Sequence, residues 1–166
     1  MAPDTTLNQV LSDYLNALDW LQNSALKSWT HQWTYAPLYL SGSYLKNYQR
    51  ALHDQSQAPG PASAGVLRAD HHIEVRRFSE DSDQCVLIDT QSQRRMATYD
   101  TTTLERVHTQ DLGEVTVVYR MAYDARSRRW KIDGFIQQLP SGWGNPKLMP
   151  HIMLMAELSA HSRHDR

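Results

Sequence analysis

The sequence has one cysteine, no long apolar run and no excess of charge of either sign, and each absence excludes a class of protein. Cys85 alone cannot form an internal disulfide, so a reducing cytoplasm is the simplest compartment. The apolar runs are far shorter than the roughly 20 residues that a membrane helix needs. The polar start, Met1 to Gln9, lacks the features of a signal peptide. With a net charge of -1, we expect neither nucleic acid nor a membrane as a partner.

Motifs that would announce a known chemistry are also missing. The sequence contains no GxSxG, no P-loop, no GxGxxG and no CxxC. Glu157, His161 and His164 have a spacing that metal ligands use on one helix face. They lie in a polar terminus without residues to orient them, however, so we predict no metal and no cofactor.

The composition that remains is typical of a globular protein, and its first half has a helical pattern. Hydrophobic residues make up 40% of the chain and charged residues 21%. Apolar residues at three- and four-residue steps predict one long curved helix from about Asp4 to about Trp33. Thr6 and Gln9 have the spacing of a capping box at its start. A second apolar stripe predicts a helix from Leu38 to near Gln55.

The second half has the two-residue period of strands. A loop over Ala58–Gly65, rich in proline and glycine, separates it from the helices. Helices grouped before strands favour an α+β fold, with the helices packed on a curved antiparallel sheet, over alternating βαβ units. The predicted strands are one that contains Ile73, Val75 and Phe78, then Cys85–Ile88, Met96–Tyr99, Val115–Tyr123 and Trp130–Leu139.

The last hairpin allows a prediction of its register. Placing Tyr123 opposite Trp130 sets Met121 against Ile132 and keeps one face apolar. The further pairs in this register are Tyr119 with Gly134, Val117 with Ile136 and, on the other face, Arg120 with Asp133.

This predicted register leaves apolar residues on the second face of the sheet. Val118, Phe135 and Leu139 lie there beside Arg120 and Asp133. Scattered surface hydrophobes are common, but three on one face favour a cover, either a partner subunit or the C-terminal segment. We therefore expect a homodimer through this sheet face.

Two strings near the end of the strand-rich half carry a resemblance to a known superfamily. Tyr119–Tyr123 reads YRMAY and Arg129–Asp133 reads RWKID. With the helices-first order, they resemble the last two strands of the NTF2-like superfamily, the cone shared with SnoaL-like polyketide cyclases and ketosteroid isomerases. The tryptophan-containing first helix and Leu38–Leu45 are similar to the IMS, ARC6-like branch.

The resemblance covers roughly residues 5–139. We therefore expect an NTF2-like domain at 1–139, and a loop with a short apolar helix at 140–166. The resemblance implies a cone with a pocket between helices and sheet. It implies no single activity, because this fold hosts enzymes, binding modules and interaction domains.

Members of this superfamily with isomerase or cyclase activity use a carboxylate or a histidine inside the cone as a general base. Asp133 is one candidate, although the register pairs it with Arg120 as a structural ion pair. His71 and His72 point to opposite faces of a strand, so only one can face the cone, and we name His72 as the candidate base. Aromatic residues with polar tips could line the pocket, or simply fill the core. The candidates for this lining are Tyr14, Tyr44, Tyr99, Tyr119 and Trp130.

Two functions remain open from the sequence. The first is a non-catalytic NTF2-like domain that binds a small apolar or peptide-like ligand in the cone, or a protein partner on the sheet. The second is a SnoaL-like cyclase, isomerase or dehydratase that acts on a small ketone or polyketide. A buried, unpaired carboxylate or histidine on the floor of the cone would favour the enzyme, and a cone filled by side chains such as Trp130 and Tyr119 would exclude it.

The predicted dimer gives a direct test. Phe135→Glu places a charge in the proposed interface and is expected to give monomers, because burying an unpaired charge is costly. Light scattering after size-exclusion chromatography measures the mass. A dimer that persists in the variant would contradict an interface at this face.

Overall fold

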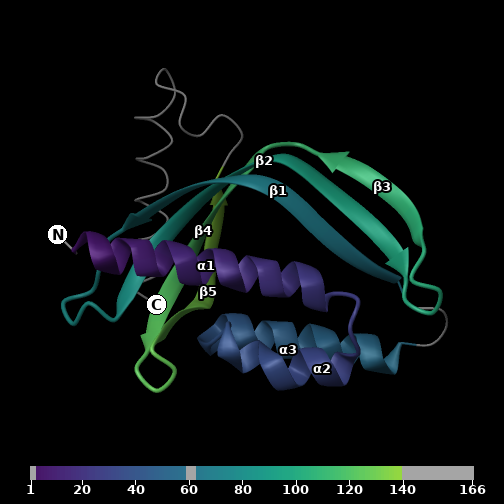
Figure 1. The fold of residues 1–166 in the computed structure, drawn as a ribbon, viewed down its shortest axis with the longest axis horizontal. Helices are drawn as coiled ribbons and strands as arrows, with labels where there is room; N and C mark the ends of the chain where they lie inside the picture. Colours follow the sequence, from purple (N-terminus) through teal and green to yellow (C-terminus); the bar gives the residue numbers. More distant parts are fainter. Residues whose placement is uncertain (1–2, 59–62, 140–166) are drawn as a thin grey trace.

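The computed structural model describes residues 3–58 and 63–139, where three helices precede a five-stranded antiparallel sheet. Figure 1 shows the strands arching over the helices, which all lie on the concave side. The predicted α+β fold with helices packed on a curved sheet is therefore confirmed. The elements are α1 (Asp4–Ser24), α2 (Trp29–Tyr35), the 3-10 turn η1 (Ala36–Leu38), α3 (Gly42–Gln57), β1 (Ser63–Arg76), β2 (Gln84–Asp100), β3 (Arg106–Leu112), β4 (Val115–Asp124) and β5 (Arg129–Leu139).

The prediction of one long first helix from the apolar spacing is wrong, because the segment forms two helices. α1 ends at Ser24, and α2 begins after Ser28, whose hydroxyl accepts a hydrogen bond from the backbone N–H of His31 at 3.1 Å. Such a cap satisfies a helix start that would otherwise lack a partner, and so fixes a new helix here. The capping box is also wrong: α1 starts behind Pro3 without a side-chain cap, and the Gln9 amide donates to the Arg128 carbonyl instead.

The strand predictions are correct in kind but not in extent. Cys85–Ile88 and Met96–Tyr99 belong to one continuous strand, β2, which pairs with β1 along one side and with β4 and then β3 along the other. The sequence analysis missed β3, which is exposed along nearly its whole length and so has no apolar face to reveal it. The predicted loop ends earlier than expected, since β1 begins at Ser63, and Phe78 lies beyond the end of β1.

The register of the β4–β5 hairpin is as predicted near the turn and differs farther along. Tyr123 pairs with Trp130, and Met121 pairs with Ile132. Beyond that point two β-bulges interrupt the ladder, and each places one extra residue in β5. The extra residues are Asp133 and Ile136.

The bulges overturn the farther register pairs and change which side chains share a face. Tyr119 pairs with Phe135 instead of Gly134, and Val117 pairs with Gln138 instead of Ile136. The Phe135 ring therefore lies on the helix-facing side, where its centroid is 6.1 Å from that of Tyr119. The expectation that Phe135 shares the outer face with Val118 is wrong, because a bulge reverses the alternation of a strand.

The outer edge of β5 is covered by the segment that leads into α3. The Ser41 N–H donates to the Ile132 carbonyl at 2.9 Å, and the Ile132 N–H donates to the Tyr39 carbonyl at 3.1 Å. Gly42 then turns the chain into α3 with a φ of +53°, in the left-handed region that favours glycine. An otherwise open edge strand is thereby protected.

The core lies between α1 and the concave face of the sheet. Trp130 belongs to it with 2% of its surface exposed. The fully buried side chains from α1 are Val10, Tyr14 and Ala17, and those from the sheet include Cys85, Leu87, Met121 and Ile132.

Two expectations from the sequence concern membrane helices and the C-terminal residues. Within 3–58 and 63–139, no helix is both long enough and apolar enough to cross a membrane. The loop and short helix expected at 140–166 lie outside the described residues.

Gly42 gives a test of how the edge is built. Gly42→Ala is expected to lower the free energy of unfolding by about 2 kcal/mol or more, because a left-handed φ costs a side chain about 1–2 kcal/mol. In addition, the new Cβ would collide with Asp133. Gly113→Ala is the matched control, because a Cβ there meets nothing within 4 Å. It should change stability by less than about 0.5 kcal/mol. Urea unfolding measures both, and equal effects would contradict this account of Gly42.

Candidate functional site

A buried carboxylate, Asp89, lies on the concave face of β2. None of its surface is exposed. Three groups converge on its Oδ2 atom: the Tyr14 hydroxyl at 2.6 Å, His71 Nδ1 at 2.8 Å and the Gln91 amide nitrogen at 3.2 Å. Burying a carboxylate is costly unless hydrogen bonds replace its hydration. The three contacts supply that replacement on Oδ2.

The position of Asp89 follows from the alternation of a central strand. Along β2, the residues Cys85, Leu87, Asp89 and Gln91 are buried and those between them are partly exposed. These side chains therefore share the concave face. β1 lies next to β2 and brings His71 opposite Gln91, while α1 crosses the same face and contributes Tyr14.

The contacts of Asp89 favour one tautomer of His71. Three donors on one oxygen are the environment of an ionised carboxylate, which can only accept. With Asp89 as the acceptor, Nδ1 of His71 is the donor of this contact, and in the neutral ring Nε2 carries the lone pair. Nε2 has no hydrogen-bond partner within residues 3–58 and 63–139. Asp89 Oδ1 also lacks a partner there.

Tyr14 stays a neutral donor in this arrangement. Burial, followed by the nearby charge of Asp89, raises the pKa of its hydroxyl well above the usual value. Burial likewise raises the pKa of Tyr44 and of Tyr119. The rings of these three tyrosines form one cluster, with Tyr119 at 6.0 Å from Tyr14 and 5.9 Å from Tyr44.

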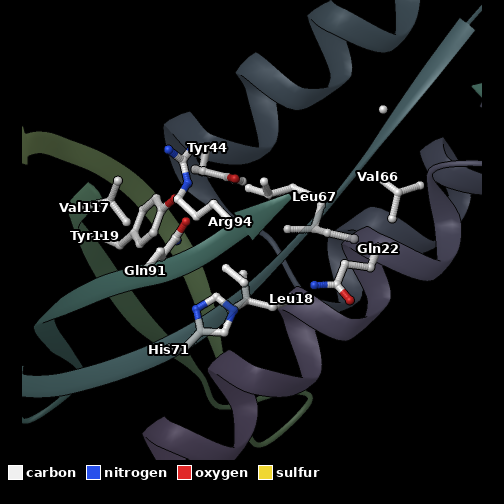
Figure 2. Close-up of a pocket in the computed structure, with 13 residues that line it drawn as sticks. Leu18, Gln22, Tyr44, Val66, Leu67, His71, Gln91, Arg94, Val117 and Tyr119 are labelled. Carbon is white, nitrogen blue, oxygen red and sulfur yellow. The ribbon is translucent and has the colours of Figure 1, made fainter. Parts of the chain in front are cut away.

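A cavity of 280 Å³ opens beside this array, between the helices and the sheet. Figure 2 shows His71 and Gln91 reaching it from the strands, with Tyr44, Tyr119 and Arg94 around another part of its wall. The remaining lining is mainly apolar and comes from α1, β1 and β4. It consists of Leu18, Leu21, Gln22, Gly65, Val66, Leu67, Ala69 and Val117.

The structure brings together three of the five predicted aromatic residues. Tyr44 and Tyr119 line the cavity, and Tyr14 lies behind it as the donor to Asp89. Trp130 and Tyr99 do not line it. Trp130 packs in the core against Phe78, and Tyr99 lies toward the far end of β2.

Of the two candidate bases, neither lies at the cavity. His72 is exposed, and its neighbour His71 takes the inward position, which strand alternation left open. Asp133 accepts from Arg120 Nε at 2.7 Å and from the Ser41 hydroxyl at 2.9 Å. The ion pair that the sequence predicted is thus present, although Arg120 lies opposite Gly134 in the ladder.

The sequence analysis missed Asp89, Gln91 and Arg94. For Asp89 a signal was available, because it follows the apolar run Cys85–Ile88 at the inward position of the alternation. A carboxylate there predicts a buried charge with partners. Arg94 had no such signal, since its distance along the chain from Asp89 places it on the opposite face of a regular strand.

Other chemistry is limited in the part of the chain that the structure describes. No group of three or more histidine, cysteine, aspartate or glutamate side chains could hold a metal ion there. Cys85 is a buried free thiol, and burial raises its pKa to about 12. It is therefore not activated as a nucleophile.

Comparisons with known proteins add no family. No protein-family model matches the chain, and no curated protein matches it.

The buried tyrosines predict a specific response to alkali. Because the pKa of Tyr14, Tyr44 and Tyr119 is higher in the folded than in the unfolded chain, folding is favoured fully below about pH 10. This contribution is lost as the pH rises further. In an alkaline pH titration, part of the rise in tyrosinate absorbance should therefore occur late, at the pH where the protein unfolds. Circular dichroism measures that unfolding.

Tyr14→Phe, Tyr44→Phe and Tyr119→Phe should each reduce that late step. A titration in which all tyrosines ionise while the protein stays folded would contradict the burial of these hydroxyls.

Proposed function

We propose that this protein is an acid–base enzyme that moves a proton on a small, largely apolar ketone. The observation that carries the proposal is the His71–Asp89 pair beside a cavity, with Nε2 of His71 free and Nδ1 held at 2.8 Å. A histidine oriented by a buried carboxylate is the usual arrangement of a general base. The proposal is the cyclase, isomerase or dehydratase alternative raised by the sequence.

Each group has a distinct role in this proposal. His71 is the catalytic base: its Nε2 removes a proton from the carbon beside the carbonyl. Asp89 is a positioning residue that stabilises the imidazolium formed, and Tyr14 and Gln91 hold Asp89 in place. Tyr44 or Tyr119 donates a hydrogen bond to the oxygen on which negative charge develops. Their raised pKa keeps both hydroxyls protonated for this task.

The same residues agree with a place in the NTF2-like superfamily, which we retain as a proposal. The proposal is supported by the helices on the concave side of a curved antiparallel sheet and by the cavity between them, since the resemblance implies a cone with a pocket there. The cytoplasmic location expected from the sequence is part of the same proposal.

A binding module without catalysis is the second candidate, and the apolar wall of the cavity favours it. Leu18, Leu21, Val66 and Leu67 would hold an apolar ligand without any proton transfer. In that case the Asp89 cluster would serve only to join α1 to the sheet.

The homodimer also remains a proposal. Val118 and Leu139 are buried, whereas Phe135 is 54% exposed on the helix-facing side. The Phe135→Glu variant therefore tests a contact at the edge strand β5 and not at the outer face.

Two neighbouring histidines provide the test of catalysis. Incubation of one- and two-ring ketones, such as 2-tetralone, in D2O measures removal of the proton beside the carbonyl by NMR. The wild-type protein is expected to accelerate exchange, and His71→Ala to reduce the rate by about 10²- to 10⁴-fold, the usual contribution of a general base. His72→Ala is the matched control and should leave the rate unchanged, because His72 is exposed on the other face.

Equal rates for the wild type and His71→Ala would contradict the enzyme. Binding of the ketones without any exchange would favour the binding module.

A further inference from the structure

An irregularity in β2 determines what Arg94 faces. Between the pairs Arg68–Arg95 and Asp70–Ser92, two residues of β2 oppose only Ala69 of β1. One of the two, Gln93, has a φ of +53°, which is uncommon for a residue other than glycine. This is a β-bulge, and bulges near functional sites re-aim side chains.

The bulge turns Arg94 toward the cavity. In a regular strand Arg94 would face away from Gln91, because the two are separated by an odd number of positions. Both nevertheless line the same cavity. A strained backbone that delivers one side chain to a cavity is typical of a functional site.

Among the described residues, the guanidinium of Arg94 has a hydrogen-bond partner at Nη1 but none at Nε. Its Nη1 donates to the carbonyl of Gly113, in the β3–β4 turn, at 3.1 Å. Its Nε is buried and has no hydrogen-bond partner in the part of the chain that the structure describes. A buried N–H without a partner is costly, so this site is built for an acceptor.

Two more donors adjoin the same place. Figure 2 shows Arg94 next to Tyr44 and Tyr119. Neither hydroxyl has a hydrogen-bond partner among the described residues, and both side chains line the cavity. Burial keeps these hydroxyls protonated, so they offer O–H groups at neutral pH.

The charges around the cavity favour an anion at this end. Arg94 is the only lining residue within the described ranges that carries a permanent charge. The nearby carboxylate, Asp89, does not line the cavity, and its Oδ2 atom already accepts from Tyr14, His71 and Gln91. An anion beside Arg94 would therefore meet one cation and two neutral donors.

We propose that the cavity binds a small carboxylic acid, with its carboxylate on Arg94 Nε and on one of the hydroxyls of Tyr44 and Tyr119, and its apolar body against Leu18 and Leu67. The other hydroxyl is left for the oxygen on which negative charge develops. This inference deepens the proposed function, on whose cavity it rests, by naming the substrate class as keto acids. A volume of 280 Å³ is just below the roughly 300 Å³ at which sites for drug-sized ligands begin. The ligand therefore has one or two rings.

The test compares a carboxylate with its neutral counterpart. 2-Naphthoate and 2-naphthamide have the same ring system and differ in charge. Titration calorimetry is expected to show the wild type binding 2-naphthoate at least about tenfold more tightly than the amide, as a charge-assisted hydrogen bond provides. Arg94→Gln should remove this preference. The NMR signal of the Arg94 Nε–H should shift with the acid and not with the amide.

Arg95→Gln is the matched control. Arg95 adjoins Arg94 in the chain, but its side chain is 69% exposed and pairs with Asp111 at 3.4 Å on the surface. This variant should retain the full preference for 2-naphthoate. Arg94→Lys keeps the charge without the Nε donor and should retain part of it, which provides a second variant if Arg94→Gln folds poorly.

Several outcomes would overturn the proposal. These are equal affinities for acid and amide, no binding of either, or the same loss in Arg94→Gln and Arg95→Gln. Arg94-dependent binding without ketone exchange would refute the proposed enzyme and support this inference. Ketone exchange without a preference for 2-naphthoate over the amide would support the proposed enzyme and refute this inference.

Discussion

The buried carboxylate of Asp89 is the constraint on which the inner architecture depends. An ionised group without solvent needs donors, and here they come from α1, from β1 and from β2 itself. Tyr14 thereby fixes where α1 crosses the sheet, and His71 is held to one orientation. The polar cluster specifies a single packing of helix on sheet, whereas the surrounding leucines and valines would tolerate small shifts. The same contacts leave one imidazole nitrogen free at the cavity.

Irregularities in the ladders have as much influence on the molecule as the regular pairs. In β5 two bulges turn Phe135 toward the helices and leave Asp133 free to meet both Arg120 and Ser41. In β2 a bulge turns Arg94 inward. Each extra residue reverses the faces of everything beyond it, so a few backbone angles decide which charges lie inside.

These effects mark how far the sequence could be interpreted. The helices-then-strands order, the two closing strands and the pairs near their turn follow from periodicity, which burial imposes directly. Tyr44 and Tyr119 were found at the cavity because aromatic residues with polar tips suit such walls. The break after Ser24 was missed, since the apolar spacing continues through it. Arg94 was beyond reach, because no pattern of side chains indicates a left-handed residue at Gln93.

Cys85 lies on the same face of β2 as Asp89, four residues away, and it is the only thiol of the chain. The residue is 2% exposed, and burial raises the pKa of its thiol to about 12, which leaves almost no thiolate at neutral pH. A thiol reagent can therefore reach it only when the sheet opens beside the site. The rate at which Cys85 is modified therefore reports how often that opening occurs. A ligand that fills the cavity would lower this rate, because it stabilises the closed form.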